Sequence, residues 1–397
     1  MPSRSRRSPF STLPGRASEQ RTFGVEEELL VVDATTLRPV PRGEAIVASA
    51  ETSAAGHRLT TEFKREQVEV VNPPQTTLDG QLAAIRTGRA IADAAAAQHD
   101  ARTVPLATSP WPLTSTLVDH PRYAEMAGRF ALTAVDQLTC GFHVHVGVAS
   151  DQEGVAALDR IRGWLPVLLA LSANSPLWMG MDTGFASYRY QVWSRWPTAG
   201  PSELFGSADG YRRHCAELLD TGVPLDEGML YFDARLSNAF PTIEVRVADV
   251  CLQPTHAAGL AAIIRALVET AVREWQAGRA PAAVSAAVLR TWSWQASRFG
   301  LTRSLVSPIT RSPAPAAEVV GQLLAAIDPV LAEFGEREPV AELIQELLAG
   351  GSGAERQREF RASATDTHNR RDLRTVVRRA LLEAGGEAAD GRLELLS

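Results

Sequence analysis

Lysine is almost absent from this chain of 397 residues. Lys64 is the one lysine, so the other 39 of the 40 basic residues are arginine. A phosphate-binding loop of the form GxxxxGK[ST] is therefore excluded, and no GxGxxG dinucleotide fingerprint occurs. Schiff-base chemistry would have to use Lys64, which lies in a densely charged segment instead of an apolar pocket. If the protein handles phosphate, arginine and metal ions must supply the positive charge.

Cysteine is also scarce, and long apolar runs are missing. Cys140, Cys215 and Cys251 lie far apart in the sequence, which provides neither a disulfide framework nor a CxxC metal knuckle. The longest apolar runs, 164–171 and 257–268, are shorter than the ~18 residues that a membrane-spanning helix needs. We therefore expect a cytoplasmic protein without a membrane partner.

The charge balance is slightly acidic. The chain has 40 Lys and Arg against 46 Asp and Glu, a formal net charge of −6, which argues against a nucleic-acid or anionic-membrane binder. With 45% hydrophobic and 22% charged residues, the composition is that of a globular protein with ample core. Residues 1–20 are basic and rich in Ser and Pro, with no apolar segment after them, so we expect a disordered tail and no signal peptide.

Segments of two periodicities interleave irregularly along the chain. Alternating patterns predict strands over 22–33, 67–71, 141–148 and 242–247. Helical patterns predict helices over 79–98, 255–275, 316–333, 340–348 and 373–383. We therefore predict an α+β fold with a mostly antiparallel sheet. The stretch 174–206, rich in Pro, Gly and aromatic residues, is expected to be an ordered functional loop region.

Each of the four predicted strands has one apolar face and one face of polar, chemically active side chains. Residues two apart on a strand share a face. The pairs that share a polar face are Glu26 with Glu28, Gln67 with Glu69, His143 with His145, and Glu244 with Arg246. Carboxylate oxygens and imidazole nitrogens are cation ligands, so the same pattern on four strands indicates a metal site.

One such strand alone has a simpler explanation. Charged residues that alternate with valine are typical of a solvated sheet face, and an isolated His-x-His pair is typical of hydrogen-bonded structure. If the four polar faces meet on one concave surface, two carboxylates ~5 Å apart repel by roughly 3 kcal/mol at an effective dielectric constant near 20. Divalent cations would then be required, and magnesium or manganese suits oxygen ligands better than zinc.

Several longer motifs resemble one known family. They are TFGVEEELLVVD, REQVEVVNPP, CGFHVHVGV, LLALSANSPLWMGMDTGFASYRY, WPTAGPSELF, FDARLSNAFPTIEVRVADV and GSGAERQREF. These motifs run from about residue 22 to about residue 361 and resemble the carboxylate–amine ligases that are grouped with bacterial type 2 glutamate–cysteine ligases. That family is in turn similar to the glutamine synthetase superfamily.

The resemblance implies a fold, a reaction and a domain organisation. The fold would be a curved, mostly antiparallel sheet that forms a funnel-like site, with helices packed behind it. The enzyme would use ATP and Mg²⁺, or Mn²⁺ in its place, to join an amino acid carboxylate to an amine, with weak glutamate–cysteine ligase activity. Residues 21–385 would form a single ligase catalytic domain between the basic tail 1–20 and a C-terminal tail, 386–397. The partners would be these small-molecule substrates, and the sequence allows either a monomer or a homo-oligomer.

The resemblance also assigns roles to individual residues. The metal ligands would be Glu26, Glu28, Glu69, His143 and Glu244, with Glu62 as a further candidate. Arg246 would grip the substrate carboxylate or phosphate, and His145 would lie beside substrate or phosphate. Arg189 and Arg235 would contact the triphosphate, because planar guanidinium groups suit phosphate oxygens; structural salt bridges are the alternative for these two.

Three other functions stay open from the sequence. A phosphagen-type kinase would use a related, arginine-rich ATP site but would phosphorylate a guanidino nitrogen. A metal-dependent hydrolase could use the His-x-His pair with carboxylates, although no HExxH motif is present. A nucleotide-binding regulatory relic of the family would bind ATP without turnover. The ligase hypothesis explains the absence of a Ser or Cys triad motif, since phosphoryl transfer needs positioning and charge neutralisation instead of a protein nucleophile.

Overall fold

The computed structural model describes residues 20–50, 56–363 and 373–385. The predicted tails, 1–20 and 386–397, lie outside these residues except for residue 20. The expectation of one catalytic domain over 21–385 stays a prediction.

A seven-stranded sheet, in which every pairing is antiparallel, organises the described residues. Its strand order is β2-β3-β1-β5-β9-β8, and β4 pairs with the end of β1. The strands are β1 (Phe23–Asp33), β2 (Arg58–Thr61), β3 (Gln67–Val71), β4 (Ala101–Val104), β5 (Gly141–Gly147), β8 (Ala234–Leu236) and β9 (Thr242–Asp249). The predicted α+β class and antiparallel sheet are confirmed, and all four predicted strands are present.

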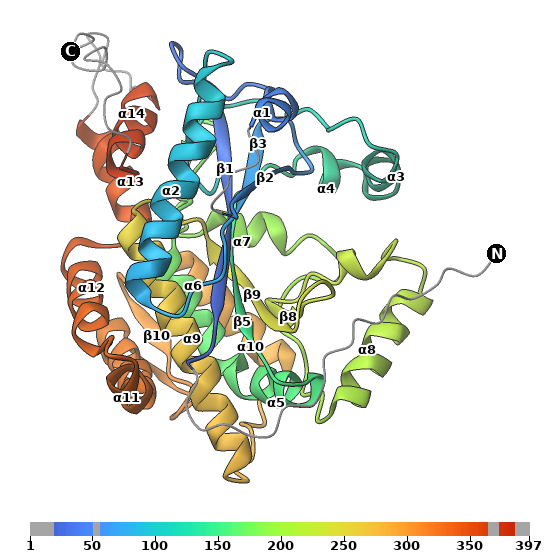
Figure 1. The fold of residues 1–397 in the computed structure, drawn as a ribbon, viewed down its shortest axis with the longest axis vertical. Coiled ribbons are helices and arrows are strands. Elements are labelled where there is room, and N and C mark those ends of the chain that lie inside the picture. The colour runs from blue at the N-terminus through green and yellow to red at the C-terminus, as the bar shows by residue number, and fades with distance from the viewer. Residues whose placement is uncertain (1–19, 51–55, 364–372, 386–397) are drawn as a thin grey trace.

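Helices pack behind one face of this sheet. These helices are α2 (Leu78–Ala97), α5 (Asp151–Ile161), α6 (Leu165–Ser172), α9 (Pro254–Gln276), α11 (Ala316–Phe334) and α12 (Arg337–Gly350). The long helix α9 contacts α5, α2, α11 and α12 and forms the centre of the larger apolar core. Figure 1 shows α2, α9, α11 and α12 on one side of the sheet, while α8 and the α3–α4 segment lie on the other. The second side therefore remains available for a site.

The remaining elements are short or peripheral. They are α1 (Gly43–Ser49), α3 (Pro121–Phe130), α4 (Leu132–Val135), α7 (Tyr188–Trp193), α8 (Ala208–Asp220), α10 (Ala286–Phe299), α13 (Gly353–Ser363) and α14 (Leu373–Glu383), with the two-stranded ribbons β6 (Leu177–Trp178) and β7 (Met181–Asp182), and β10 (Ser304–Val306) and β11 (Pro313–Pro315). Two 3₁₀ turns cover Arg162–Trp164 and Glu227–Met229. The loop region expected over 174–206 contains β6, β7 and α7, so it is more regular than predicted.

Side-chain caps fix the start of two helices that follow sheet strands. The Thr77 hydroxyl accepts a hydrogen bond from the Gly80 backbone N–H (3.1 Å), and the Ser150 hydroxyl accepts one from Glu153 N–H (3.2 Å). Each bond satisfies a donor that the first helical turn would otherwise leave without a partner. Each cap therefore fixes the residue at which its helix begins.

One helix passes the length and composition test for a membrane span. Within the residues described, only α9 does so, and 78% of its apolar window is buried inside the protein. Its flanking helices and the sheet cover it on several sides. The apolar character of α9 is therefore explained by its place in the core.

Successive side chains of strand β1 point alternately to the helix-covered face and to the open face of the sheet. Glu27 is fully buried on the helix side, where Arg89 of α2 donates to both of its oxygens (2.7 and 3.2 Å). The same guanidinium donates to the Cys251 and Leu252 carbonyls (2.7 and 2.8 Å). A buried carboxylate is tolerated only when paired and hydrogen-bonded, so this contact anchors α2 to the sheet.

Removal of that guanidinium is expected to destabilise the fold strongly. Arg89→Met should lower the free energy of unfolding by about 3–5 kcal/mol, because Glu27 would be left as a buried, unpaired charge. Urea unfolding followed by circular dichroism measures the change, with Arg86→Met, an exposed arginine on the same helix, as the matched control. If Arg89→Met and Arg86→Met unfold at the same urea concentration, the pair does not anchor the helix.

Candidate active site

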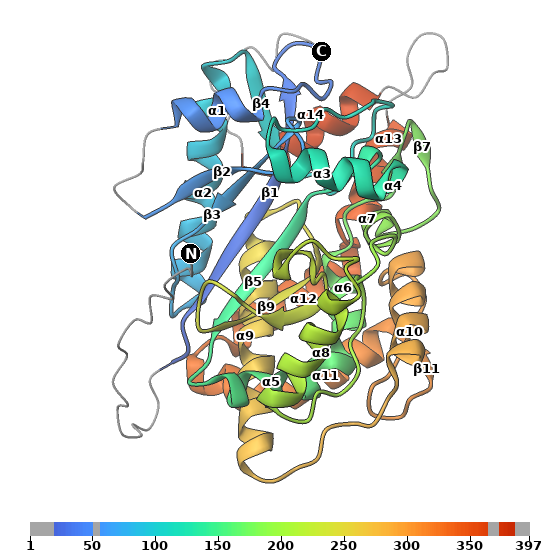
Figure 2. The ribbon, with the colours of Figure 1, turned by 90° about the vertical axis from the view of Figure 1, so that its right-hand side faces the viewer.

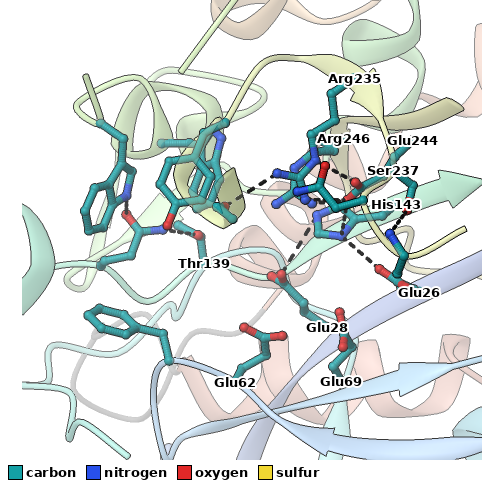
Figure 3. A pocket seen from close by; sticks show the side chains of 18 of the residues that line it. Glu26, Glu28, Glu62, Glu69, Thr139, His143, Arg235, Ser237, Glu244 and Arg246 are labelled. Atoms are coloured by element: carbon teal, nitrogen blue, oxygen red, sulfur yellow. Dashed lines mark hydrogen bonds and ion pairs between the residues drawn. The ribbon is translucent and has the colours of Figure 1, made fainter. Parts of the chain in front are cut away.

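The open face of the sheet forms the floor of a cavity of about 510 Å³. Eight of the nine residues predicted for the site line it, and Glu62 lines it as well. The eight are Glu26, Glu28, Glu69, His143, His145, Arg235, Glu244 and Arg246. Figure 3 shows the carboxylates and His143 gathered around one space, with the two arginines on its far side. Positions that are more than 200 residues apart in the sequence therefore meet in one place.

Antiparallel register produces this convergence. Glu28 of β1 lies opposite Glu69 of β3, and Glu26 lies opposite His143 of β5. On the far side of β5, His145 lies opposite Glu244 of β9. Directly opposed side chains on one face are ~4.5–5.5 Å apart at Cβ, so the polar faces of four neighbouring strands form one continuous surface.

Three groups of side chains in this cavity have the geometry of cation sites. They are Glu26 with Glu69 and His143, Glu26 with His145 and Glu244, and Glu28 with Glu62 and Glu69. Within each group, one potential ligand atom per residue lies within 4.8 Å of the others. Shared members make the three groups a single, connected set of oxygen and imidazole ligands.

The carboxylates at one end of the set hold protons that ordinary glutamates would release. Burial, and then the charge of Glu28, raises the pKa of Glu62 to about 8. Burial, and then the charge of Glu62, raises the pKa of Glu69 well above its usual value. Such shifts are the expected result when several carboxylates share a buried space without compensating charge.

At the other end of the set, positive groups compensate the carboxylates. Burial alone would raise the pKa of Glu26, but hydrogen bonding to His143 and His145 holds it well below the usual range. Glu244 is buried too, yet Arg246 and Arg235 lower its pKa. Arg235 donates through Nε to Glu244 (2.7 Å), and Arg246 also contacts this carboxylate.

His143 occupies the middle of the cavity. Its Nδ1 lies 3.5 Å from Glu26 and 3.9 Å from Glu244, and its Nε2 lies 3.9 Å from Glu28. Burial and then the charge of Arg246 lower the pKa of His143, so the imidazole is neutral near pH 7. The buried Nε2 has no hydrogen-bond partner in the part of the chain that the structure describes. A neutral imidazole with a free nitrogen among carboxylates is a suitable ligand for a cation.

Strand β9 is irregular beside His143. The register with β5 shifts between Phe142 and Val144, which indicates a β-bulge. Arg246 N–H donates to the Asp233 carbonyl (2.9 Å) at the same place. Bulges change the direction of side chains and are frequent near active sites. This one accompanies the contact between Arg246 and Glu244, two residues that were predicted to share a face.

Arg189 is a correction to the predicted site. It was expected to contact the triphosphate, but it does not line the cavity and is only 2% exposed. Its guanidinium lies 3.8 Å from the Asp249 carboxylate, which also accepts hydrogen bonds from Ser175 (2.6 Å) and Ser187 (2.8 Å). Arg189 therefore forms a structural salt bridge, which was the alternative to a triphosphate contact. Arg189 lies beside the floor on the face that carries His143, since a Cβ on Gly141 would meet both the Arg189 guanidinium and His143 Nε2.

An aromatic region forms the part of the cavity that the sequence did not reveal. Its residues are Phe63, Tyr123, Met126, Trp193, Trp196 and Tyr231. Trp196 Nε1 donates to Gln137 (3.1 Å), and Gln137 donates to Thr139 (2.5 Å), so a chain of hydrogen bonds fixes this wall. These residues come from loops and short helices without periodicity. The concentration of aromatic residues in 174–206 was the one available signal. It indicated a functional region that contains Trp193 and Trp196, but it did not single out these two residues.

A divalent cation fits the donor set. The cavity supplies carboxylate oxygens from five glutamates and a free imidazole nitrogen, which suits magnesium or manganese. The raised pKa values of Glu62 and Glu69 show where negative charge is in excess.

The pH dependence of stability tests this electrostatic description. Because the pKa of Glu62 is raised from 4.5 to about 8, the folded chain keeps a proton that the unfolded chain releases above pH 4.5. The free energy of unfolding should therefore fall as pH rises from about 4.5 to 8 when EDTA removes cations. Glu62→Gln should raise the melting temperature by a few degrees at pH 8.5 and leave it unchanged near pH 4.

Thermal melts in EDTA at several pH values measure this difference, with Glu346→Gln, an exposed carboxylate of α12, as the control. Magnesium added at pH 8.5 should reduce the gap between wild type and Glu62→Gln. Parallel pH profiles for wild type and Glu62→Gln would contradict the proposed charge excess.

Comparisons with known proteins agree with this geometry. The profile of glutamate-cysteine ligase family 2 matches residues 22–380. A protein of Paenarthrobacter aurescens named "Putative glutamate--cysteine ligase 2-1" is 52% identical over 345 residues, which is 85% of this chain and 90% of that protein.

Two solved structures share the fold at low sequence identity. A glutamate–cysteine ligase of Francisella tularensis, in complex with AMP, has a TM-score of 0.66 at 11% identity, covering 95% of this chain and 91% of that one. A bifunctional glutathione synthetase of Pasteurella multocida has a TM-score of 0.66 at 16% identity; 92% of this chain spans 52% of that one, about half its length. The chain therefore belongs to glutamate–cysteine ligase family 2 and is an ATP-dependent carboxylate–amine ligase.

Proposed function

We propose that this cavity joins the carboxylate of glutamate to an amine through an acyl phosphate, with cysteine as at least a weak amine substrate. The observation that carries the proposal is the convergence of five glutamates, two histidines and two arginines on one cavity floor. The relative in Paenarthrobacter aurescens carries glutamate and cysteine in its name, which supports the choice of substrates.

The chemistry explains why such a charged site is useful. A carboxylate is a poor electrophile, because an amine that attacked it would have to expel oxide. In the proposed reaction a carboxylate oxygen attacks the γ-phosphorus of ATP, the bond to the bridging oxygen breaks, and ADP leaves. The amine nitrogen then attacks the carbonyl carbon, the bond to phosphate breaks, and the nitrogen loses a proton. Both steps depend on positioning and charge neutralisation, which fixed charged groups can supply.

The proposed cation ligands are the groups that the cavity brings together. They are Glu26, Glu28, Glu69, His143 and Glu244, with Glu62 beside Glu28 and Glu69. When bound there, Mg²⁺ or Mn²⁺ would neutralise phosphate oxygens and polarise the transferred phosphoryl group. The role of this chain is to fix the ligands on neighbouring strands.

Arg246 and Arg235 are the proposed contacts for substrate carboxylate and phosphate. Both now engage Glu244, and Arg235 also donates to the Leu230 carbonyl (3.1 Å). Planar guanidinium groups bind paired oxygens, so a bound carboxylate or phosphate could share these donors with Glu244. His145 would orient the ligand beside Glu26; its Nδ1 is hydrogen-bonded to Thr242 (2.9 Å).

We further propose that the enzyme acts in the cytoplasm on small molecules, either as a monomer or as a homo-oligomer.

Two conservative substitutions test the assignment. Glu28→Gln and Glu244→Gln keep side-chain size but remove a negative charge, so each should lower ADP formation by roughly 100-fold or more. ADP release with glutamate, ATP and a panel of amines that includes cysteine measures the rate, and mass spectrometry identifies the amide. Glu125→Gln, an exposed glutamate of α3, is the matched control. Full activity of both site variants would refute the metal assignment.

A further inference from the structure

A second cavity, of about 290 Å³, is lined by helices and loops and not by the strands that carry the active site. Its walls come from the end of α5, the turn Arg162–Trp164, helices α9 and α10, and the loop that joins these two helices. Figure 2 shows this loop crossing the end of the molecule opposite α3 and α4. No lining residue is shared between this cavity and the active-site cavity.

Two arginines with incomplete hydrogen bonding line this second cavity. Arg162 is 4% exposed; it donates to the Val284 carbonyl (2.9 Å), but its buried Nε has no hydrogen-bond partner among the described residues. Arg160 donates to the carbonyls of Ala156 (2.6 Å) and Arg279, and within the same residues its buried Nε also lacks a partner. Burial lowers the pKa of both guanidinium groups. Buried donors without acceptors are costly, and both guanidinium groups border a cavity with room for an acceptor.

The carboxylates in and near this cavity make no close ion pair with either arginine within the described residues. Asp159 uses both oxygens to accept from the Phe205 and Gly206 backbone N–H groups (2.8 Å each). Glu203, which is 60% exposed, approaches Arg162 only to 3.8 Å. Arg160 forms no ion pair within the part of the chain that the structure describes, and Glu274 lies 3.4 Å from Arg279.

The rest of the wall is apolar and aromatic. Trp164, Trp292, Leu289 and Ile309 line it, and the hydroxyl of Thr270 adds one more buried polar atom without a partner. Ile309 is 64% exposed although it borders this second cavity. A mostly apolar cavity with a few converging polar groups is typical of small-molecule sites.

We propose that this second cavity binds a small organic anion, in which a carboxylate, sulfonate or phosphate group is attached to a flat apolar body. The anionic group would accept hydrogen bonds from Arg162 and Arg160, and the apolar body would pack between Trp164 and Trp292. This proposal is independent of the ligase reaction, because neither arginine lines the active-site cavity.

A pair of probes that differ in charge tests the proposal on the full-length protein. The anion 8-anilinonaphthalene-1-sulfonate should bind wild type at one site per chain, detected by its fluorescence and by quenching of tryptophan. Arg162→Met should weaken binding of this anion by roughly tenfold or more, because a charge-assisted hydrogen bond is lost. The neutral analogue N-phenyl-1-naphthylamine should be affected little, and Arg162→Lys should restore part of the anion affinity.

Controls separate this site from the active site and from a folding defect. Arg212→Met, at an exposed position on α8, should bind the anion as wild type does. Melting temperatures confirm that each variant folds, and Arg160→Met gives a second test if Arg162→Met does not fold. Saturating ATP with Mg²⁺ should leave anion binding unchanged. The proposal is overturned if wild type does not bind the anion, if ATP displaces it, or if the arginine variants bind it normally.

Discussion

Repulsion among buried carboxylates is the constraint on which the site depends. Three strands and the turn after β2 bring five glutamates to one cavity floor, and at one end of it burial and mutual charge keep Glu62 and Glu69 protonated beyond the usual pH range. At the other end, two arginines and two histidines hold Glu244 and Glu26 ionised. A site built in this way gains stability from any bound cation. Cations held by these carboxylates would in turn neutralise phosphate in the proposed reaction.

Two buried ion pairs, one on each face of the sheet, support this arrangement. Glu27 and Arg89 form a buried pair that joins β1 to α2, while Glu26 and Glu28 of the same strand face the cavity. Arg189 and Asp249 form a second buried pair beside the floor, next to Gly141 of β5, and Ser175 and Ser187 donate further hydrogen bonds to Asp249. Neighbouring glutamates of β1 therefore have different tasks: Glu27 anchors a helix, while Glu26 and Glu28 face the cavity.

The two-residue period made much of this site predictable from the sequence. In each of the pairs Glu26 with Glu28, His143 with His145, and Glu244 with Arg246, the two residues could be assigned to the same face of their strand. Arg189 was predicted wrongly as a ligand of phosphate, because sequence does not show which arginine meets a buried carboxylate such as Asp249. The aromatic wall around Tyr123 and Tyr231 was missed, since loops without periodicity carry it. Helices α8 and α10 also escaped prediction.

The central claim is that cations occupy the carboxylate floor, and anomalous X-ray diffraction tests it most directly. Crystals of the protein grown with Mn²⁺ and a non-hydrolysable ATP analogue would give manganese peaks that no other atom produces. We predict peaks bounded by the carboxylates of Glu26, Glu69 and Glu244, with His143 as a nitrogen ligand and the analogue's phosphates as further ligands. Nucleotide bound in the cavity without manganese beside these glutamates, or manganese only at exposed carboxylates, would contradict the account.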